Sequence, residues 1–131
     1  QTPGAIGYTE LAYAAQNKLT TAAIRNANGE FVAPSIESVT AAAAGAVAKL
    51  PPNTDYRVSI VNAPGKGVYP ISSFTWIIAY GKQADSAKGQ KLTEFLRWAL
   101  TDGQGMEAAL DYAPLPEAMR TALVSKIDSI Q

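Results

Sequence analysis

Hydrophobic residues recur with helical spacing most clearly over residues 86–101. Charged positions there lie between apolar ones that share one helix face, namely Leu92, Phe95, Leu96, Ala99 and Leu100. This stripe predicts an amphipathic helix with one buried side. The pair Asp102-Gly103 follows directly and predicts a glycine cap at the end of that helix.

Four other stretches also have helical character. Residues 11–16 and 35–50 are rich in alanine, which has the highest helix propensity, and each predicts a helix. Residues 105–111 predict one or two further turns. Pro116 suits the first position of a last helix, whose expected inner face comprises Met119, Ala122, Leu123 and Ile127.

Two continuous apolar runs of strand length predict buried strands. They are residues 5–9, AIGYT, and residues 74–80, FTWIIAY. Asn28-Gly29 lies between two short apolar runs and predicts a tight hairpin turn. Residues 58–61 add one short apolar segment. The order of these segments predicts an α/β fold with four or five strands and four helices.

The two buried strands raise a problem of pairing. A central strand needs neighbours on both sides, because each unpaired buried amide or carbonyl costs roughly 1–3 kcal/mol. The hairpin and residues 58–61 offer too few strands to flank both runs. We therefore expect the remaining strands to come from another polypeptide or from a removed part of this one. The first residue, a glutamine and not a methionine, favours a cut end.

Composition narrows the class of protein. The chain has 131 residues, 47% hydrophobic and 17% charged, which predicts one globular domain. Eleven basic residues balance eleven acidic ones, so no nucleic-acid or membrane-surface binder is indicated. Cysteine and histidine are both absent, which excludes thiolate catalysis and cysteine zinc sites and removes the commonest general base. The longest apolar run, residues 74–80, is too short to span a bilayer.

Four blocks occur in one order with characteristic gaps: PGAIGYTELAYAAQNKL, NANGEFVAPS, YPISSFTWIIAYGKQ and LTEFLRWALTDGQGMEAALDYAPLP. Together they resemble the C-terminal portion of the periplasmic phosphate-binding protein of bacterial ABC-type phosphate importers. The resemblance implies an α/β fold of the two-lobed periplasmic-binding-protein type II class, incomplete without its N-terminal portion. Residues 1–68 would complete the second lobe, residues 69–73 would form the hinge crossover, and residues 74–131 would complete the first lobe.

The same resemblance implies a function. The chain would be a segment of a phosphate receptor that scaffolds both lobes while a hinge closes on inorganic phosphate. Its partners would be the N-terminal segment of the receptor and the membrane permease of the importer, with no nucleic acid, no cofactor and no enzymatic activity. Its location would be periplasmic or extracytoplasmic, with membrane-anchored and cell-surface forms as variants.

No phosphate ligand can be assigned from the family pattern. The family's hallmark is an arginine followed shortly by Ser-Gly-Thr at a helix start, and Ser-Gly-Thr does not occur here. The candidates for lining the cleft are Tyr8, Thr9 and Glu10, at the C-terminal end of a predicted strand, and Ser72 and Ser73, at the start of another. For the two serines, a role in strand entry is favoured over ligand contact.

For three other features the sequence allows two interpretations, one functional and one purely structural. The glycine-rich residues 63–67 suggest a phosphate cradle, but a solvent-facing turn is favoured because the Walker spacing is absent. Arg25, beside Asn26 and Asn28, suggests an anion contact, but a surface charge at the hairpin tip is favoured. An aromatic set suggests stacking, but core packing is favoured for Phe95, Trp76, Trp98 and Tyr112. Two rival functions remain: an autonomous interaction domain without phosphate binding, and a phosphatase-like enzyme, which the absence of histidine and cysteine disfavours.

Overall fold

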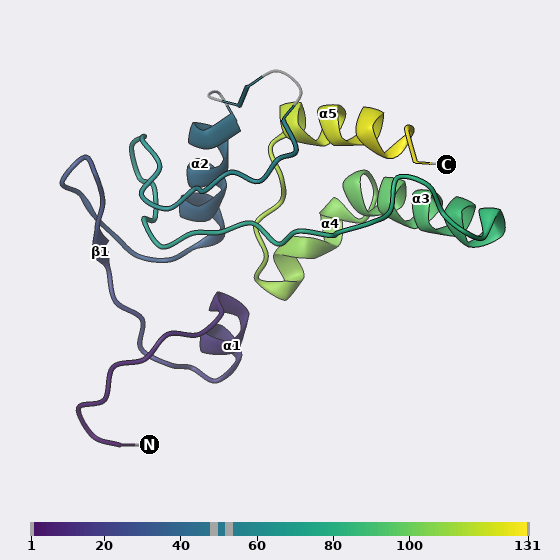
Figure 1. Cartoon of the computed structure of the whole chain (residues 1–131). Helices are drawn as coiled ribbons and strands as arrows, with labels where there is room; N and C mark the ends of the chain where they lie inside the picture. The colour runs from purple at the N-terminus through teal and green to yellow at the C-terminus, as the bar shows by residue number, and fades with distance from the viewer. Residues whose placement is uncertain (1, 48–49, 52–53, 131) are drawn as a thin grey trace.

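The structure, a computed structural model, describes residues 2–47, 50–51 and 54–130. Five α-helices, one 3-10 turn and one hairpin occur in these ranges (Figure 1). The elements in chain order are α1 (Leu11–Gln16), β1 (Ile24–Arg25), β2 (Phe31–Val32), α2 (Ile36–Val47), α3 (Ser86–Leu100), α4 (Gln104–Glu107), η1 (Ala108–Leu110) and α5 (Glu117–Ile127). Helices α3 and α5 pack against each other, whereas α1 lies on a separate N-terminal arm (Figure 1).

The predicted helices are confirmed within the described ranges. Helix α1 has the predicted bounds, and α3 covers the predicted stretch except its last residue. Helix α2 starts one residue after the predicted position, and Leu50, the predicted last residue, is not helical; residues 48–49 lie outside the described residues. On α5, Met119 and Ile127 are buried as predicted, but Ala122 is exposed. Fewer residues of α5 are therefore buried than its apolar pattern predicts.

The prediction that Gly103 caps the end of α3 as a left-handed glycine is wrong. Gly103 has a φ of −62° and starts α4, so it does not adopt the left-handed conformation of a glycine cap. Instead, its amide donates a hydrogen bond of 2.9 Å to the carbonyl of Trp98. A Cβ atom at this position would lie 3.0 Å from the Cα atom of Ala99. Glycine is favoured here because residue 103 passes close to the last turn of α3, where a larger residue would force its neighbours to shift.

The hairpin predicted at Asn28-Gly29 is confirmed. Strands β1 and β2 pair antiparallel, with Ile24 opposite Val32 and Arg25 opposite Phe31. Gly29 has a φ of +81°, which favours glycine in a tight turn. The side-chain oxygen of Asn26 accepts hydrogen bonds from the amides of Asn28 and Glu30, both at 3.0 Å, and so fixes the loop.

The hydrophobic core is small and lies between α2 and the loop that follows it. Its buried members are Ala42, Ala46, Ile60, Ala63 and Val68, and Phe74 packs against them. Ile60 is 1% exposed although residues 58–61 form no strand. Small residues on α2 let the loop approach closely, which explains why an alanine-rich helix forms this core.

The two predicted buried strands are not seen as strands. Residues 5–9 and 74–80 have no assigned secondary structure, and β1 and β2 are the only strands in the described residues. Ile6 and Tyr8 are fully exposed, and Ile78 is 96% exposed. The physical reason is the lack of partners: within the described ranges no backbone–backbone hydrogen bond reaches residues 74–80. Figure 1 shows this run as a trace that crosses to the start of α3.

Candidate functional site

The predicted hinge crossover, residues 69–73, is bonded to the core at its start. The amide of Tyr69 donates to the carbonyl of Ser38 on α2 at 3.1 Å. The carbonyl of Pro70 accepts from the amide of Asn62 at 2.8 Å. These two bonds connect the crossover to both sides of the small core, so its position is set by α2 and by the loop at residues 60–68.

The two serines of the crossover have different surroundings. Ser72 is 5% exposed, and its hydroxyl donates to the carbonyl of Tyr69 at 2.8 Å. Ser73 is exposed, and its hydroxyl donates to the carbonyl of Phe74 at 3.2 Å. Ser72 therefore stabilises the turn that starts the run 74–80, while Ser73 stays accessible to solvent.

Tyr8, Thr9 and Glu10 lie on the N-terminal arm and are all exposed. Glu10 precedes α1 with an extended backbone, and its side chain forms no capping hydrogen bond. Within the described residues, no hydrogen bond joins this group to Ser72 or Ser73. The structure thus shows no hydrogen-bonded contact between the two predicted groups of cleft residues in its described part.

The glycine-rich loop already holds a carboxylate from its own chain. The amide of Gly67 donates to Glu30 Oε2 at 2.9 Å, and Asn26 Nδ2 donates to the same oxygen at 3.1 Å. Hydrogen bonds from Gly67 and Asn26, together with the nearby charge of Lys66, hold the pKa of the Glu30 carboxyl below its ordinary value. The Gly67 amide is thus already bonded to a negatively charged group of the chain, which supports the interpretation of 63–67 as a surface turn.

Further bonds make this contact a defined junction between the hairpin and the loop. Asn28 Nδ2 donates to the carbonyl of Gly65 at 2.7 Å, and Asn26 Nδ2 donates to the carbonyl of Val68 at 3.2 Å. Asn26 is 6% exposed, so its polar atoms are satisfied inside the protein. Sequence analysis missed this junction; its signal was the clustering of Asn26, Asn28 and Glu30 beside a tight turn.

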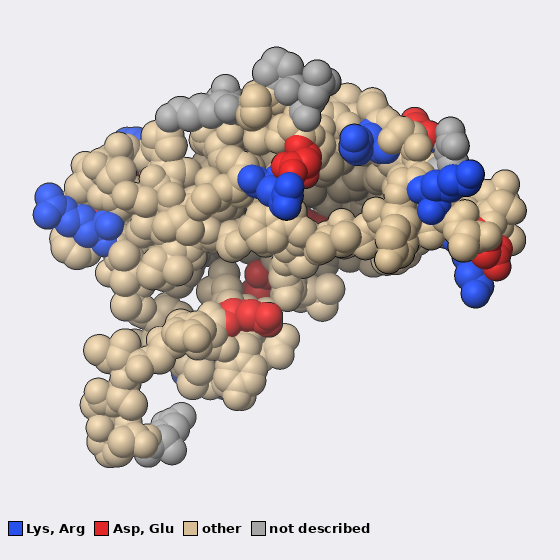
Figure 2. All heavy atoms as spheres, in the orientation of Figure 1, with Lys and Arg blue, Asp and Glu red and all other residues tan. Residues whose placement is uncertain are grey.

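The described residues show neither a patch of one charge sign on the viewed face nor a metal site. Figure 2 shows acidic and basic residues scattered over the viewed face, without a patch of one sign. Arg25 is exposed and its guanidinium lies beside Gly29, in agreement with a surface charge. No group of acidic residues suited to a metal ion occurs in the described part of the chain. None of the helices described is both long enough and apolar enough to cross a membrane.

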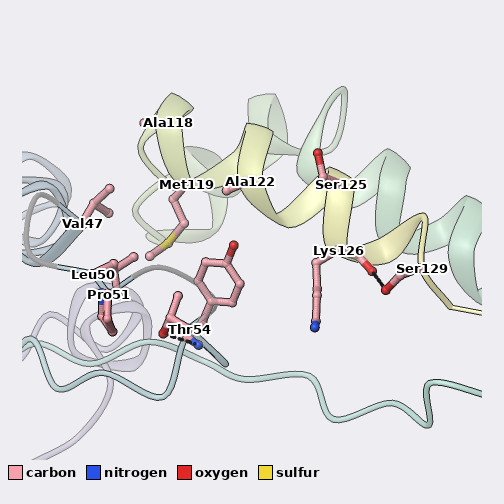
Figure 3. A pocket seen from close by; sticks show the side chains of 11 residues that line it. Val47, Leu50, Pro51, Thr54, Ala118, Met119, Ala122, Ser125, Lys126 and Ser129 are labelled. Carbon is pink, nitrogen blue, oxygen red and sulfur yellow. Dashed lines mark hydrogen bonds between the residues drawn. The ribbon is translucent and has the colours of Figure 1, made fainter.

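An open pocket of about 560 Å³ lies between the end of α2 and α5 (Figure 3). Val47 and Leu50 line one side, and Met119 and Ala122 line the other. Lys126 is the only charged side chain among the described lining residues. One cation on an otherwise apolar and hydroxyl-bearing wall provides neither an acid–base pair nor an anion cradle, so we assign the pocket no chemistry.

The predicted aromatic core is not observed. Four rings of this set are each at least 43% exposed, with Phe95 and Trp98 side by side on α3, 5.9 Å between centroids. Trp76 and Tyr112 are both 48% exposed. The described residues offer no apolar layer to cover these rings, which accounts for the difference from the prediction.

Comparisons with known proteins identify the family. Residues 1–103 match the PBP superfamily domain. The phosphate-binding protein PstS of Xylella fastidiosa strain Temecula1 is 40% identical over 116 residues, which cover 88% of this chain and 31% of the relative. The phosphate-binding protein PstS of Methanocaldococcus jannaschii is 36% identical over 139 residues, covering 99% of this chain and 36% of the relative.

A third relative, the phosphate-binding protein PstS3 of Mycobacterium bovis strain BCG, is 33% identical over 135 residues, covering 98% of this chain and 36% of the relative. The chain spans about a third of the length of the curated relatives that it matches. These matches confirm the resemblance and the fold class that the four sequence blocks predicted. The chain belongs to the PBP superfamily.

Proposed function

We propose that this chain is the C-terminal segment of a phosphate-binding receptor that serves an ABC-type phosphate importer. The observation that carries the proposal is the 40% identity over 116 residues with a protein named phosphate-binding protein PstS. In this proposal residues 1–68 complete the second lobe, 69–73 form the hinge crossover and 74–131 complete the first lobe. The receptor acts outside the cytoplasm and delivers phosphate to the permease.

The exposure of the two apolar runs supports a partner polypeptide. Ile6, Tyr8 and Ile78 are each at least 96% exposed, and all three have the size and shape of buried strand residues. Strands contributed by the N-terminal segment of the receptor would cover them and complete two sheets. The N-terminal segment would also supply the phosphate ligands, because the family's arginine and Ser-Gly-Thr pattern is absent from this chain.

Within that assembly, this chain positions the cleft more than it binds the anion. Closure about the crossover would exclude water from phosphate, which strengthens every hydrogen bond to it. Tyr8, Thr9, Glu10 and Ser73 are exposed and are our candidates for the cleft wall. Ser72, already bonded to Tyr69, would hold the crossover in shape.

Calorimetry on the chain with and without a complementary segment tests the proposal. We expect no heat of phosphate binding from the chain alone. Adding the N-terminal two-thirds of the Xylella fastidiosa relative should give phosphate binding with a dissociation constant on the order of micromolar. Ile78→Lys should abolish this gain, because a charge would enter a buried strand, whereas the control Phe31→Lys, on the exposed hairpin, should keep it.

Three results would contradict the proposal. Phosphate binding by the chain alone would show that its own residues form the anion site. A stable complex with the N-terminal segment that binds no phosphate would instead support an interaction domain without receptor activity. Release of phosphate from a phosphate ester would favour a phosphatase-like enzyme.

A further inference from the structure

Asn28 combines a chemically labile sequence position with an exposed place at the tip of the β1–β2 hairpin. It is the only asparagine in the chain that directly precedes a glycine, and both Asn28 and Gly29 are exposed. Asparagine is one of the thermally labile residues of proteins. Glycine has no Cβ atom, so its amide nitrogen approaches the preceding side chain with less hindrance than that of any other residue.

We propose that Asn28-Gly29 is a deamidation site and that the junction between the hairpin and the loop controls its rate. The amide nitrogen of Gly29 forms a bond to Cγ of Asn28, the Cγ–Nδ2 bond breaks, and Nδ2 leaves as ammonia with the proton of the Gly29 amide. Water then opens the succinimide ring to aspartate or isoaspartate and releases a proton. This chemistry belongs to the chain itself and does not rest on the proposed function.

Both reacting groups are held by hydrogen bonds in the folded chain. The amide of Gly29 donates to the carbonyl of Asn26 at 2.9 Å, and Asn28 Nδ2 donates to the carbonyl of Gly65 at 2.7 Å. Both bonds must open before the nitrogen can attack, so the rate should follow the fraction of molecules in which the hairpin tip is locally open. The bond from Gly67 to Glu30 keeps the tip on the loop, and its weakening should raise that fraction.

The product cannot restore the bond that the reaction removes. A carboxylate at position 28 has no proton to donate, and the carbonyl of Gly65 is also an acceptor. The two oxygens repel each other, and the carbonyl loses the donor that Asn28 supplied. The new charge also lies two positions from the carboxylate of Glu30. Deamidation should therefore loosen the junction irreversibly.

Peptide mapping by mass spectrometry tests the site on the full chain, kept folded in mildly alkaline buffer. Asn17 is the matched control in the same molecule, because it is also exposed and its Nδ2 also donates to a carbonyl, that of Tyr13 at 2.9 Å, but a lysine follows it. Position 28 should gain the mass that separates a carboxylate from an amide at least roughly tenfold faster than position 17, since lysine has the Cβ atom that hinders attack. Equal rates at the two positions would overturn the proposal.

A charge variant tests the control by the junction. Glu30→Gln weakens the bond to Gly67 and should accelerate deamidation of Asn28 several-fold, while the rate at Asn17 stays unchanged. Glu94→Gln, which removes only the ion pair with Lys91 on α3, should change neither rate. A rate at Asn28 that is the same in Glu30→Gln and in the natural chain would show that the junction does not gate the reaction.

Hydrogen exchange at the Gly67 amide tests the structural consequence. Asn28→Asp reproduces one product of the reaction, and Asn28→Ala removes the same bond to Gly65 without adding a charge. Exchange should be fastest in Asn28→Asp, slower in Asn28→Ala and slowest in the natural chain. An exchange rate in Asn28→Asp no higher than that in Asn28→Ala would overturn the inference that the new carboxylate forces the junction open.

Discussion

The carboxylate of Glu30 accepts a 2.9 Å hydrogen bond from the amide of Gly67, a residue 37 positions further along the chain. The bond joins the tip of the β1–β2 hairpin to the loop that carries Ala63 and Val68 into the core. Asn28 reinforces it through its 2.7 Å bond to the carbonyl of Gly65. The orientation of the hairpin therefore depends on one carboxylate and two amide side chains.

Replacement of this carboxylate should loosen the junction without unfolding the chain. Glu30→Gln keeps an oxygen that can accept from Gly67 but loses the charge that strengthens the bond. We expect the Gly67 amide to exchange with solvent several-fold faster, as measured by hydrogen exchange. The control is Glu94→Gln, which removes only the ion pair with Lys91 on α3. Equal exchange at Gly67 in the natural protein and in Glu30→Gln would contradict the role of the charge.

The hydrogen bonds to Glu30 predict that the stability of the folded chain depends on pH. The backbone bond from Gly67 and the side-chain bond from Asn26 lower the pKa of Glu30 below its ordinary value of 4.5. A carboxylate with a lowered pKa in the folded state stabilises that state above pH 4.5, and the stabilisation is lost as the pH falls through the folded pKa. Hydrogen bonds within their own segments also lower the pKa of Glu37 and of Asp55, so these groups act with the same sign.

The expected outcome is a melting temperature that falls with acidification below pH 4.5. Calorimetric melting at several pH values should show a shallower fall for Glu30→Gln, because that variant has no group to protonate at this position. A parallel fall in the two proteins would show that Glu30 does not contribute to the acid sensitivity.

The elements predicted well are those whose signal is local. The apolar stripe of α3 and the Asn28-Gly29 turn depend on spacing and backbone preference within a few residues. The expected strands at 5–9 and 74–80 depend on ladder partners, which a local pattern does not supply. Gly103 shows the same limit, because its position after the amphipathic stretch 86–101 suggested a cap, whereas in the structure it lies close to Trp98 and Ala99 on α3.

The candidate site was predictable only in part. The plain interpretation of residues 63–67 agrees with the structure, but the reason, a carboxylate 37 residues away, has no local signature. Ser72 was singled out for its place before an apolar run, and its bond to Tyr69 stabilises the turn before that run, although the run itself forms no strand. Tyr8, Thr9 and Glu10 are exposed on the N-terminal arm, and their cleft-lining role stays a prediction.

Gly45 is expected to resist substitution although it lies inside a helix. An added Cβ atom would stand 2.5 Å from the carbonyl oxygen of Pro64, too close without a shift of the loop. Gly45→Ala gains about 1 kcal/mol of helix propensity, but overpacking typically costs about 1–3 kcal/mol. Urea unfolding should therefore show a net loss of stability or none gained. Gly105→Ala in α4, where an added Cβ meets nothing within 4 Å, should be stabilising, and equal gains in both variants would contradict the clash.

Asp85 is the N-cap residue of α3. Its carboxylate accepts hydrogen bonds from the amides of Ala87 at 3.0 Å and Lys88 at 3.2 Å, two groups that have no partner inside the helix. Asp85→Ala leaves both amides to water and should lower the free energy of unfolding by about 1 kcal/mol. Asp85→Asn, which keeps an accepting oxygen, should retain most of the stability, and Asp102→Ala, beyond the other end of α3, serves as the control.

Because α3 packs on α5 and its Arg97 pairs with Asp128, a frayed first turn should not release α5. Chemical denaturation followed by circular dichroism should therefore show one weakened transition, and an Asp85→Ala variant as stable as the natural chain would show that the cap does not contribute.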